Sequence, residues 1–382
     1  MHRPRARVLS TRVGFDDGIG WVVQRTVSTG PSLCHAQTMA VTSKDIARQL
    51  KISQSTVSRA LRGDPRVAPE TTARILETAR EMDYTPNLAA RSLITRKTGT
   101  VALIVSDITN PFYPELLDVL HNEFALGGYR TVLFNERTDA PLEQHVSDLV
   151  NGAAVDGLVY VSATLGTPLP GRGVRAVPVV LVNRYIDSTE VDTVVSDNRR
   201  GGRIVAQAIV GLGHRRIALI AGPENATTSR DRERGFREGL EARRVKLDET
   251  LRRAGQFSHH SGYECCLDLL ATEPRPTAIF AANDVIAFGA LDAARRLGVS
   301  VPDELSIVGF DDIDMAGWEG FNLTTVRQPL AQMGHAAVSL LLERIAAVGD
   351  QHRPRTLVFP VGLVRRDTLA AAREAPAAGN AG

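Results

Sequence analysis

The sequence predicts a small helical head followed by a larger α/β region. Two short amphipathic helices joined by a tight turn occupy residues 42 to 61. From Gly99 onward, short apolar runs rich in β-branched residues alternate with helical patterns, as in parallel sheets covered by helices on both faces. The chain has 382 residues. The α/β region of roughly 270 residues exceeds a comfortable single core, so we expect two α/β lobes.

Charge and cysteine content narrow the class of protein. The whole chain carries a formal net charge of +2, but residues 39 to 98 hold eleven Lys and Arg against six Asp and Glu. This concentration of basic charge is what a nucleic-acid-binding module requires. Cys34, Cys265 and Cys266 form neither a disulfide framework nor a zinc pattern, which favours reduced thiols in a cytoplasmic protein. No apolar stretch approaches the ~20 residues of a membrane span.

Residues 1 to 38 differ from the rest of the chain. They lack amphipathic periodicity, and Asp16, Asp17 and Gln24 interrupt the apolar run that a signal peptide needs. We interpret them as a disordered extension, with Met39 as a candidate natural start. The Ala-rich residues 369–382 are interpreted as a disordered tail.

The first helix of the head is defined by its cap and its apolar spacing. Thr42 is expected to cap it by accepting backbone N–H bonds, with Asp45 at the third helical position. The apolar stripe of this helix consists of Ile46, Ala47 and Leu50.

A second helix, capped by Ser53, follows the short turn Lys51-Ile52. Two helices joined by so tight a turn form a helix-turn-helix, whose second helix enters the major groove of DNA. Its outward side chains are short polar groups and one long cation, which suit base edges and phosphates: Gln54, Ser55, Thr56, Ser58 and Arg59. Spacing alone leaves open that residues 53–56 merely cap a surface helix.

A third helix completes the predicted head. Pro69 fits its first turn. Its core face is expected to hold Ile75, Leu76, Ala79 and Met82. We therefore predict a DNA-binding head at residues 39–86.

Seven short runs are predicted as strands of the α/β region. They are Val101–Val105, Thr131–Phe134, Gly157–Val161, Val179–Val182, Arg216–Ala221, Thr277–Ala281 and Leu305–Gly309. Helical patterns between them include Pro114–Leu126, Asn198–Leu212, Arg230–Arg243, Asp284–Leu297 and Leu330–Val348. The adjacent His259 and His260 cannot share one helical face, and we interpret them as part of a solvated loop.

Polar and aromatic side chains follow the predicted strands. In open parallel sheets, ligands bind beyond the carboxyl ends of the strands, so these side chains define a candidate ligand site. Carboxylate, amide and guanidinium groups pair with hydroxyls, and an aromatic ring stacks on a sugar or base, so we expect a polyhydroxylated ligand. The candidates are Phe112, Asn183, Arg184, Arg232, Asn283 and Asp311.

Some residues near these strand ends have a second interpretation. Asp284 is expected to cap a helix, and Asp312 is expected to be structural. Phe112 could be plain core, and Trp318 could flank the cleft or cover a loop. The sequence contains no Walker loop, zinc-ligand helix or nucleophile elbow, so it predicts no enzyme, cofactor or metal site.

Three ordered motifs run through the head and the segment behind it. They are Asp45-Ile46-Ala47, Ser53-x-x-Thr56-Val57-Ser58-Arg59-Ala60-Leu61 and Tyr84-x-Pro86-Asn87-x-x-Ala90-Arg91-Ser92-Leu93. In this order they resemble the LacI/GalR (lactose repressor) family of bacterial transcription regulators. The resemblance continues to about Asp367. Lys51 departs from it, because the family usually has a small residue or Gly before the recognition helix.

The resemblance implies roles for DNA-contacting residues. Gln54 and Ser55 fall on positions that choose bases, and Arg59 falls on a base or phosphate contact. Residues 87–98 match the family's hinge helix and linker, where side chains reach the minor groove and an apolar wedge kinks the duplex. The full set of DNA-binding candidates is Thr42, Ser53, Gln54, Ser55, Thr56, Ser58, Arg59, Asn87, Ala90, Arg91 and Leu93, with Arg91 on the minor-groove side and Leu93 as the wedge.

The resemblance also implies an architecture for residues 99–368. They would form two similar lobes, like those of periplasmic sugar-binding proteins, which bind an effector and dimerise. The chain would cross between the lobes near Val194, Thr324 and Gln351. The family's effector-contacting positions fall on Arg232, Asn283 and Asp311, and its stacking position falls on Phe112.

Together these features predict a cytoplasmic, sequence-specific DNA-binding transcription regulator, most often a repressor. The implied partners are a pseudo-palindromic double-stranded DNA operator, a small carbohydrate effector and a second copy of the chain, since a palindromic site needs at least a dimer. The alternative is a sugar-binding or transport receptor, or an enzyme on a similar two-lobed fold. Such proteins would have no head or hinge, and a receptor would carry an export signal.

Overall fold

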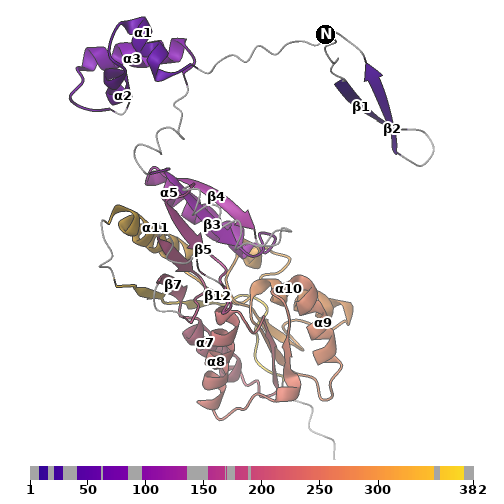
Figure 1. Cartoon of the computed structure of the whole chain (residues 1–382). Coiled ribbons are helices and arrows are strands. Elements are labelled where there is room, and N and C mark those ends of the chain that lie inside the picture. Colours follow the sequence, from indigo (N-terminus) through magenta and orange to yellow (C-terminus); the bar gives the residue numbers. More distant parts are fainter. Residues whose placement is uncertain are drawn as a thin grey trace, which may run out of the picture. The chain divides into compact units, whose positions relative to one another are not determined.

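The computed structural model describes two compact units, residues 1–88 and 89–382 (Figure 1). Within them the described residues are 41–61, 63–84, 97–135, 154–167, 169, 177–187, 191–347 and 353–373, together with two strands at 8–15 and 21–28.

The two N-terminal strands form a hairpin. Strands β1 (Val8–Phe15) and β2 (Trp21–Ser28) pair antiparallel, with Phe15 opposite Trp21. The sequence predicts disorder here, and these strands differ from that prediction. Both segments are rich in β-branched residues, which favour strands even where no helical or alternating apolar pattern is present.

The head consists of three helices, α1 (Ser43–Leu50), α2 (Gln54–Ala60) and α3 (Pro69–Glu81), as the sequence predicts. Their core is formed by Ile46, Ala47, Val57, Ala60, Ile75 and Ala79. Leu76 was expected in this core but is 41% exposed. Each residue of a helix is turned about 100° from the one before it, so when Ile75 and Ala79 face inward Leu76 points away.

The first lobe of the second unit is built on a six-stranded parallel sheet in the order β13-β7-β6-β5-β3-β4. Helices α5 (Phe112–Leu126) and α11 (Leu330–Ala346) pack against each other in this lobe. The sequence predicted four of these strands and missed two short ones, β7 and β13. The strands are β3 (Thr100–Val105), β4 (Arg130–Asn135), β5 (Gly157–Tyr160), β6 (Val179–Val182), β7 (Asp192–Ser196) and β13 (Thr356–Phe359).

The second lobe holds a parallel sheet in the order β11-β10-β8-β9. Helices α7 and α8 lie together on one side of it, and α9 and α10 lie together on the other (Figure 1). The strands are β8 (Ile217–Ala221), β9 (Arg252–Ala254), β10 (Ala278–Ala281) and β11 (Ser306–Val308). The helices are α7 (Asn198–Gly211), α8 (Thr227–Glu241), α9 (His259–Leu270) and α10 (Asp284–Arg296), with 3-10 turns η1 (Glu249–Leu251) and η2 (Asp314–Gly317).

The chain crosses between the lobes three times. It leaves β7 for α7, and it leaves β12 (Thr325–Arg327) for α11. The third crossing joins β13 to β14 (Gly362–Val364), which pairs antiparallel with β12. This crossing lies beyond the expected position at Gln351, because the chain first adds β13 to the edge of the first sheet.

Helix α9 corrects the interpretation of His259 and His260 as a loop. They form the first turn of this helix, whose N-cap is Ser258, which accepts the backbone N–H of Ser261. Nε2 of His259 lies 2.9 Å from Oδ2 of Asp292 on α10. The pair needs no shared helical face, because both histidines are exposed in the first turn and neither packs in the core.

The C-terminal segment is ordered further than the predicted boundary at 369. Leu369 is buried, and the backbone of Ala370 binds Ser306 and His214. The N–H of Ala372 donates to the carbonyl oxygen of Leu212. These backbone bonds hold residues that are too small and featureless to signal their order in the sequence.

Close helix packing in the second lobe positions α8. A Cβ on Gly235 would lie 1.8 Å from the carbonyl oxygen of Arg199, and one on Gly202 would lie 2.2 Å from that of Arg232. Only glycine permits this approach of α7 and α8. The contact between the two helices thereby positions Arg232, which lies on α8.

Candidate functional site

The N-terminus of α1 is closed by a capping box between Thr42 and Asp45, as the sequence predicts. The carboxylate of Asp45 accepts hydrogen bonds from the backbone N–H of Thr42 at 3.0 Å and from its hydroxyl at 2.7 Å. The Thr42 side chain thus donates to the acid as well as facing the backbone N–H of Asp45. These bonds hold the pKa of Asp45 below its ordinary value.

The second helix of the head presents the predicted polar face. The hydroxyl of Ser53 accepts the backbone N–H of Thr56 at 3.1 Å, which confirms it as the N-cap. Gln54, Ser55 and Arg59 are exposed, whereas Thr56 and Ser58 are half-buried. Nε2 of Gln54 donates to the hydroxyl of Ser43 at 3.2 Å, which orients its amide over the start of α1.

Lys51 makes the turn between α1 and α2 in the left-handed region, with φ of 53°. Its N–H donates to the carbonyl oxygen of Arg48, and the N–H of Ile52 donates to that of Ala47. This geometry explains why a small residue or Gly is favoured here, since a side chain in this region costs about 1–2 kcal/mol. The lysine keeps the turn and adds a positive charge beside α2.

The hinge candidates Asn87, Ala90, Arg91 and Leu93 lie outside the described residues. The description resumes at Lys97, where the chain enters the first lobe. The carboxylate of Asp156 accepts the backbone N–H of Thr98 at 2.8 Å and that of Gly99 at 2.7 Å. Asp156 therefore anchors the end of the linker to the first lobe.

All six effector candidates line one cleft between the two lobes. The cleft has about 220 Å³ of empty space when the open solvent at its mouth is included. The carboxyl ends of strands from both sheets bring the candidates together, as the rule for parallel sheets predicts. Its lining is Asn110, Phe112, Tyr113, Asn183, Arg184, Thr228, Arg232, Phe257, Asn283 and Asp311.

Four lining residues were not among the candidates. Asn110 and Tyr113 belong to the same run after β3 as Phe112, so that run already contained the signal. Thr228 lies one helical turn before Arg232 on α8. Phe257 precedes α9, a helix that the sequence did not predict, and no local signal marked it.

Arg232 is the most heavily bonded cation of the cleft. Its Nε donates to Oδ1 of Asn198 at 2.9 Å, and its Nη1 donates to the carbonyl oxygen of Ala282 at 2.7 Å. Nη2 forms an ion pair with Oδ1 of Asp311 at 2.8 Å, and the guanidinium lies 3.7 Å from the ring centroid of Phe310. Arg232 is thus held in one orientation, with its charge balanced by Asp311.

Two consecutive residues after β11 have positive φ, 127° at Asp311 and 58° at Asp312. Asp312 pairs with Arg327 at 2.5 Å and with Arg366 at 2.7 Å, which confirms its structural role. Non-glycine residues in this region mark stored strain, which surrounding contacts must hold. The two ion pairs of Asp312 hold the turn that presents Asp311 to the cleft.

Asn283, and not Asp284 as expected, caps the helix α10. Asn283 is the N-cap of α10, and its Oδ1 accepts the backbone N–H of Ile286 at 2.9 Å. Its amide nitrogen is therefore the group it can offer to a ligand. Asp284 does not cap: it accepts bonds from the backbone N–H of Ile313 at 3.0 Å and the hydroxyl of Thr325 at 2.5 Å. Burial raises the pKa of Asp284.

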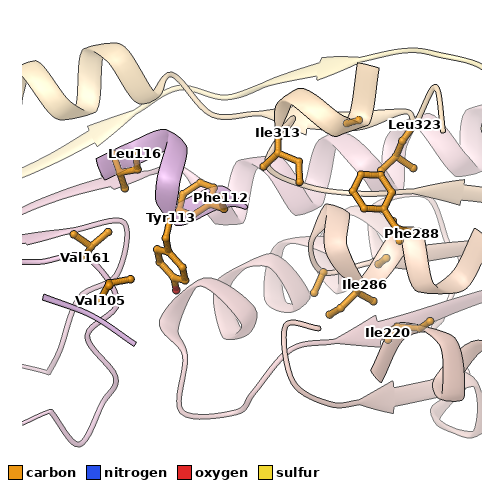
Figure 2. Close-up of a cluster of buried hydrophobic side chains, with 14 of the residues drawn as sticks. Val105, Phe112, Tyr113, Leu116, Val161, Ile220, Ile286, Phe288, Ile313 and Leu323 are labelled. Carbon is orange, nitrogen blue, oxygen red and sulfur yellow. The ribbon is translucent and has the colours of Figure 1, made fainter. Parts of the chain in front are cut away.

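The aromatic candidates have separate positions. Phe112 and Tyr113 begin α5 and belong to a buried cluster with Val105, Val161 and Ile313 (Figure 2). Their rings meet edge to face, 5.5 Å apart. Phe112 is thus both core and cleft lining, and the two interpretations of this residue are compatible. Trp318 is 52% exposed and does not line the cleft.

Asn183 and Arg184 follow β6 and are both buried. Asn183 has φ of 69°, a left-handed conformation that Asn tolerates better than most residues. Nη1 of Arg184 donates to the carbonyl oxygen of Ser162 at 3.2 Å, and its guanidinium lies 5.4 Å from the ring centroid of Phe257 in the other lobe. Oδ1 of Asn183 and Nε of Arg184 have no hydrogen-bond partner.

Tyr185 connects the two lobes beside the cleft. Its backbone N–H donates to the hydroxyl of Thr227 at 3.2 Å, and its own hydroxyl donates to Oδ2 of Asp231 at 2.9 Å. Nη2 of Arg230 donates to the same hydroxyl at 3.1 Å. Because Tyr185 follows β6 and the other three residues lie at α8, these bonds span the lobes.

In the described part of the chain, no group of three or more His, Cys, Asp or Glu residues could hold a metal ion. No helix among the same residues is long and apolar enough to cross a membrane.

Comparison with known proteins covers both units. Residues 42–87 match the model for bacterial regulatory proteins of the lacI family, and residues 206–369 match a periplasmic binding protein-like domain. The transcriptional regulator DegA of Bacillus subtilis is 34% identical over 337 residues, which are 86% of this chain and 98% of DegA. The chain belongs to the LacI family.

Solved structures of LacI-family proteins share the fold. A complex of the transcriptional regulator CelR with cellobiose is 32% identical, with a TM-score of 0.66 over 86% of this chain and 99% of that one. The Lac repressor dimer bound to operator and an anti-inducer is 25% identical, with a TM-score of 0.74 over 87% of this chain and all of that one. This LacI-family protein is accordingly a DNA-binding transcription regulator and not an enzyme.

Proposed function

We propose that this LacI-family regulator acts as a cytoplasmic homodimeric repressor that binds a pseudo-palindromic operator. A sugar or sugar derivative bound in the cleft controls its affinity for that operator. The head, residues 39–86, contacts the major groove through α2, and residues 87–98 provide the hinge. Residues 99–368 bind the effector and the second subunit. A transport receptor is disfavoured, because it would have no use for a helix-turn-helix.

The observation that carries this proposal is the cleft itself. Side chains from both lobes reach it, among them Asn183 and Arg184 from the first lobe and Arg232 and Asp311 from the second. A ligand that touches both lobes stabilises their closed arrangement, because it binds that arrangement better than an open one. Donors and acceptors in fixed positions around an aromatic ring suit a polyhydroxylated molecule.

The similar proteins support the same assignment. CelR has been solved with cellobiose, and the Lac repressor has been solved as a dimer on its operator. Both cover nearly all of the length of the present chain that lies beyond the N-terminal extension. The polar, exposed face of α2 in this chain fits a role in DNA recognition.

A route from the cleft to the DNA begins at the first lobe. Asp156 holds the backbone of Thr98 and Gly99, the last residues of the linker. Movement of the first lobe against the second, across the bonds of Tyr185, would therefore carry the linker with it. Coupling of this kind is reciprocal and typically changes affinity by about 5- to 150-fold.

Arg59→Ala tests the DNA-binding role of the exposed face of α2. We expect operator binding to weaken and the slope of log affinity against log salt to fall by about 1.8, because the dimer loses one phosphate contact from each subunit. The measurement is a salt series of binding to duplex operator. Arg243→Ala, at an exposed residue of the second lobe, is the matched control and should keep the wild-type slope. An unchanged affinity and slope in Arg59→Ala would remove Arg59 from the interface.

A further inference from the structure

The first lobe contributes two buried polar groups to the cleft that have no hydrogen-bond partner among the described residues. Asn183 is 4% exposed and Arg184 is 6% exposed. Oδ1 of Asn183 and Nε of Arg184 have no hydrogen-bond partner, and both residues line the cleft. Buried polar groups in native proteins are nearly always bonded, so two orphans at one ligand cleft indicate that a ligand completes them.

Arg184 has no direct ion-pair partner among the described residues, and the charge of Asp311 acts on it only at longer range. Nη1 bonds only a neutral carbonyl oxygen, that of Ser162, and the guanidinium faces the ring of Phe257 at 5.4 Å. Among the described residues, no carboxylate forms an ion pair with Arg184, whereas Arg232 has Asp311 at 2.8 Å. A buried cation without a partner is costly, and a carboxylate or phosphate is the group that compensates it best.

The charges around the cleft leave one positive charge in excess. Arg184 and Arg232 contribute two positive charges, and Asp311 contributes the only carboxylate among the lining residues. Asp284 lies behind the lining, and burial raises its pKa, which favours its neutral form. The described lining of the cleft is thus electropositive on the side of the first lobe.

We propose that the effector is an anionic sugar derivative, whose carboxylate or phosphate binds Arg184 and one of whose hydroxyls donates to Oδ1 of Asn183. This inference rests on the proposed function and specifies its ligand. The ring lies toward Arg232 and Asp311, where a guanidinium and a carboxylate pair with hydroxyls.

Matched sets of sugars test the proposal with the full chain. Each set contains a neutral sugar, its uronate and its phosphate: glucose with glucuronate and glucose 6-phosphate, and galactose with galacturonate and galactose 6-phosphate. Inorganic phosphate and acetate are added as probes of the anion site alone. Binding is measured by calorimetry and thermal shift at constant ionic strength. We expect at least one acidic sugar to bind about ten- to a hundredfold more tightly than its neutral parent.

The Arg184→Gln variant tests whether Arg184 is the group that makes the acidic sugar bind more tightly than its neutral parent. The glutamine keeps a polar side chain but removes the charge, so the advantage of the acidic sugar over its neutral parent should vanish. Arg243→Gln, an exposed arginine outside the cleft, is the control and should keep it. The uronate and phosphate arms distinguish the two sources of the anion.

Three outcomes would overturn the inference. They are tighter binding of a neutral sugar than of both its anions, an undiminished preference in Arg184→Gln, and no stabilisation of the wild-type chain by inorganic phosphate or any acidic sugar. The first outcome, with a change in operator affinity on adding the neutral sugar, would leave the proposed function intact. Loss of all operator binding in the wild-type chain would instead count against the proposed function.

Discussion

Arg232→Ala is expected to lower the free energy of unfolding by about 3–5 kcal/mol. The substitution breaks a fully buried ion pair and leaves the carboxylate of Asp311 without its cation at 2.8 Å. It also removes the bonds from Arg232 to Asn198 and Ala282. Denaturant unfolding of the purified chain measures the loss. Arg234→Ala, an exposed arginine on the same helix, is the control and should change stability by less than about 0.5 kcal/mol.

A double variant separates the stability of this ion pair from its role in ligand binding. Arg232→Met with Asp311→Leu removes both charges, and replacing a whole buried pair by apolar residues is often neutral or stabilising. We expect this variant to unfold near the wild-type denaturant concentration but to lose the effect of ligand on operator affinity. A double variant that still responded at wild-type ligand concentrations would refute the role of Arg232 and Asp311 in binding.

Asp284→Asn is expected to flatten the dependence of stability on pH. Burial raises the pKa of Asp284, and the neighbouring Asp311 adds to the shift. The folded state therefore holds a proton that the unfolded state releases above about pH 4, so this carboxyl lowers stability as pH rises. The loss continues up to the raised pKa of the folded state and then levels off.

The asparagine mimics the protonated acid. Its Oδ1 can accept the N–H of Ile313, and its amide can donate to the hydroxyl of Thr325, which now accepts. Denaturant unfolding at a series of pH values compares the two proteins. The raised pKa values of Glu115 and Asp231 are present in both proteins and cancel from the difference, which therefore reports Asp284 together with its neighbour Asp311. Parallel pH profiles would show that Asp284 carries no proton that depends on folding.

The cleft could be predicted because its position follows from topology. Short, continuous apolar strands such as Val179–Val182 are visible in the sequence, and their carboxyl ends must meet at one edge of a parallel sheet. Asn183 follows such a strand directly and Asp311 lies three residues beyond another, so both were found. Phe257 was missed, because it precedes α9, and the adjacent His259 and His260 led us to interpret the start of that helix as a loop.

Other errors arose where two neighbouring residues competed for one role. Asn283 and Asp284 are both good helix caps, and only the packing of Ile313 and Thr325 around the second decides that the first one caps. Leu76 and Ile75 are equally apolar, and the phase of α3 against the other two helices selects Ile75. The strands β12 and β14 are three residues each and are stabilised by pairing with each other, although they lie far apart in the sequence. Neither segment therefore shows a pattern of its own that predicts a strand.

Selection of duplex DNA from a random library tests the central claim most directly. The full wild-type chain is predicted to enrich one pseudo-palindromic sequence, because α2 presents Gln54 and Ser55 outward from a helix-turn-helix and two subunits read two half-sites. The same selection with a Gln54→Ala and Ser55→Ala variant should lose that sequence or relax it at fixed positions. No enriched sequence for the wild-type chain, or the same sequence for both proteins, would contradict the claim that this helix reads DNA.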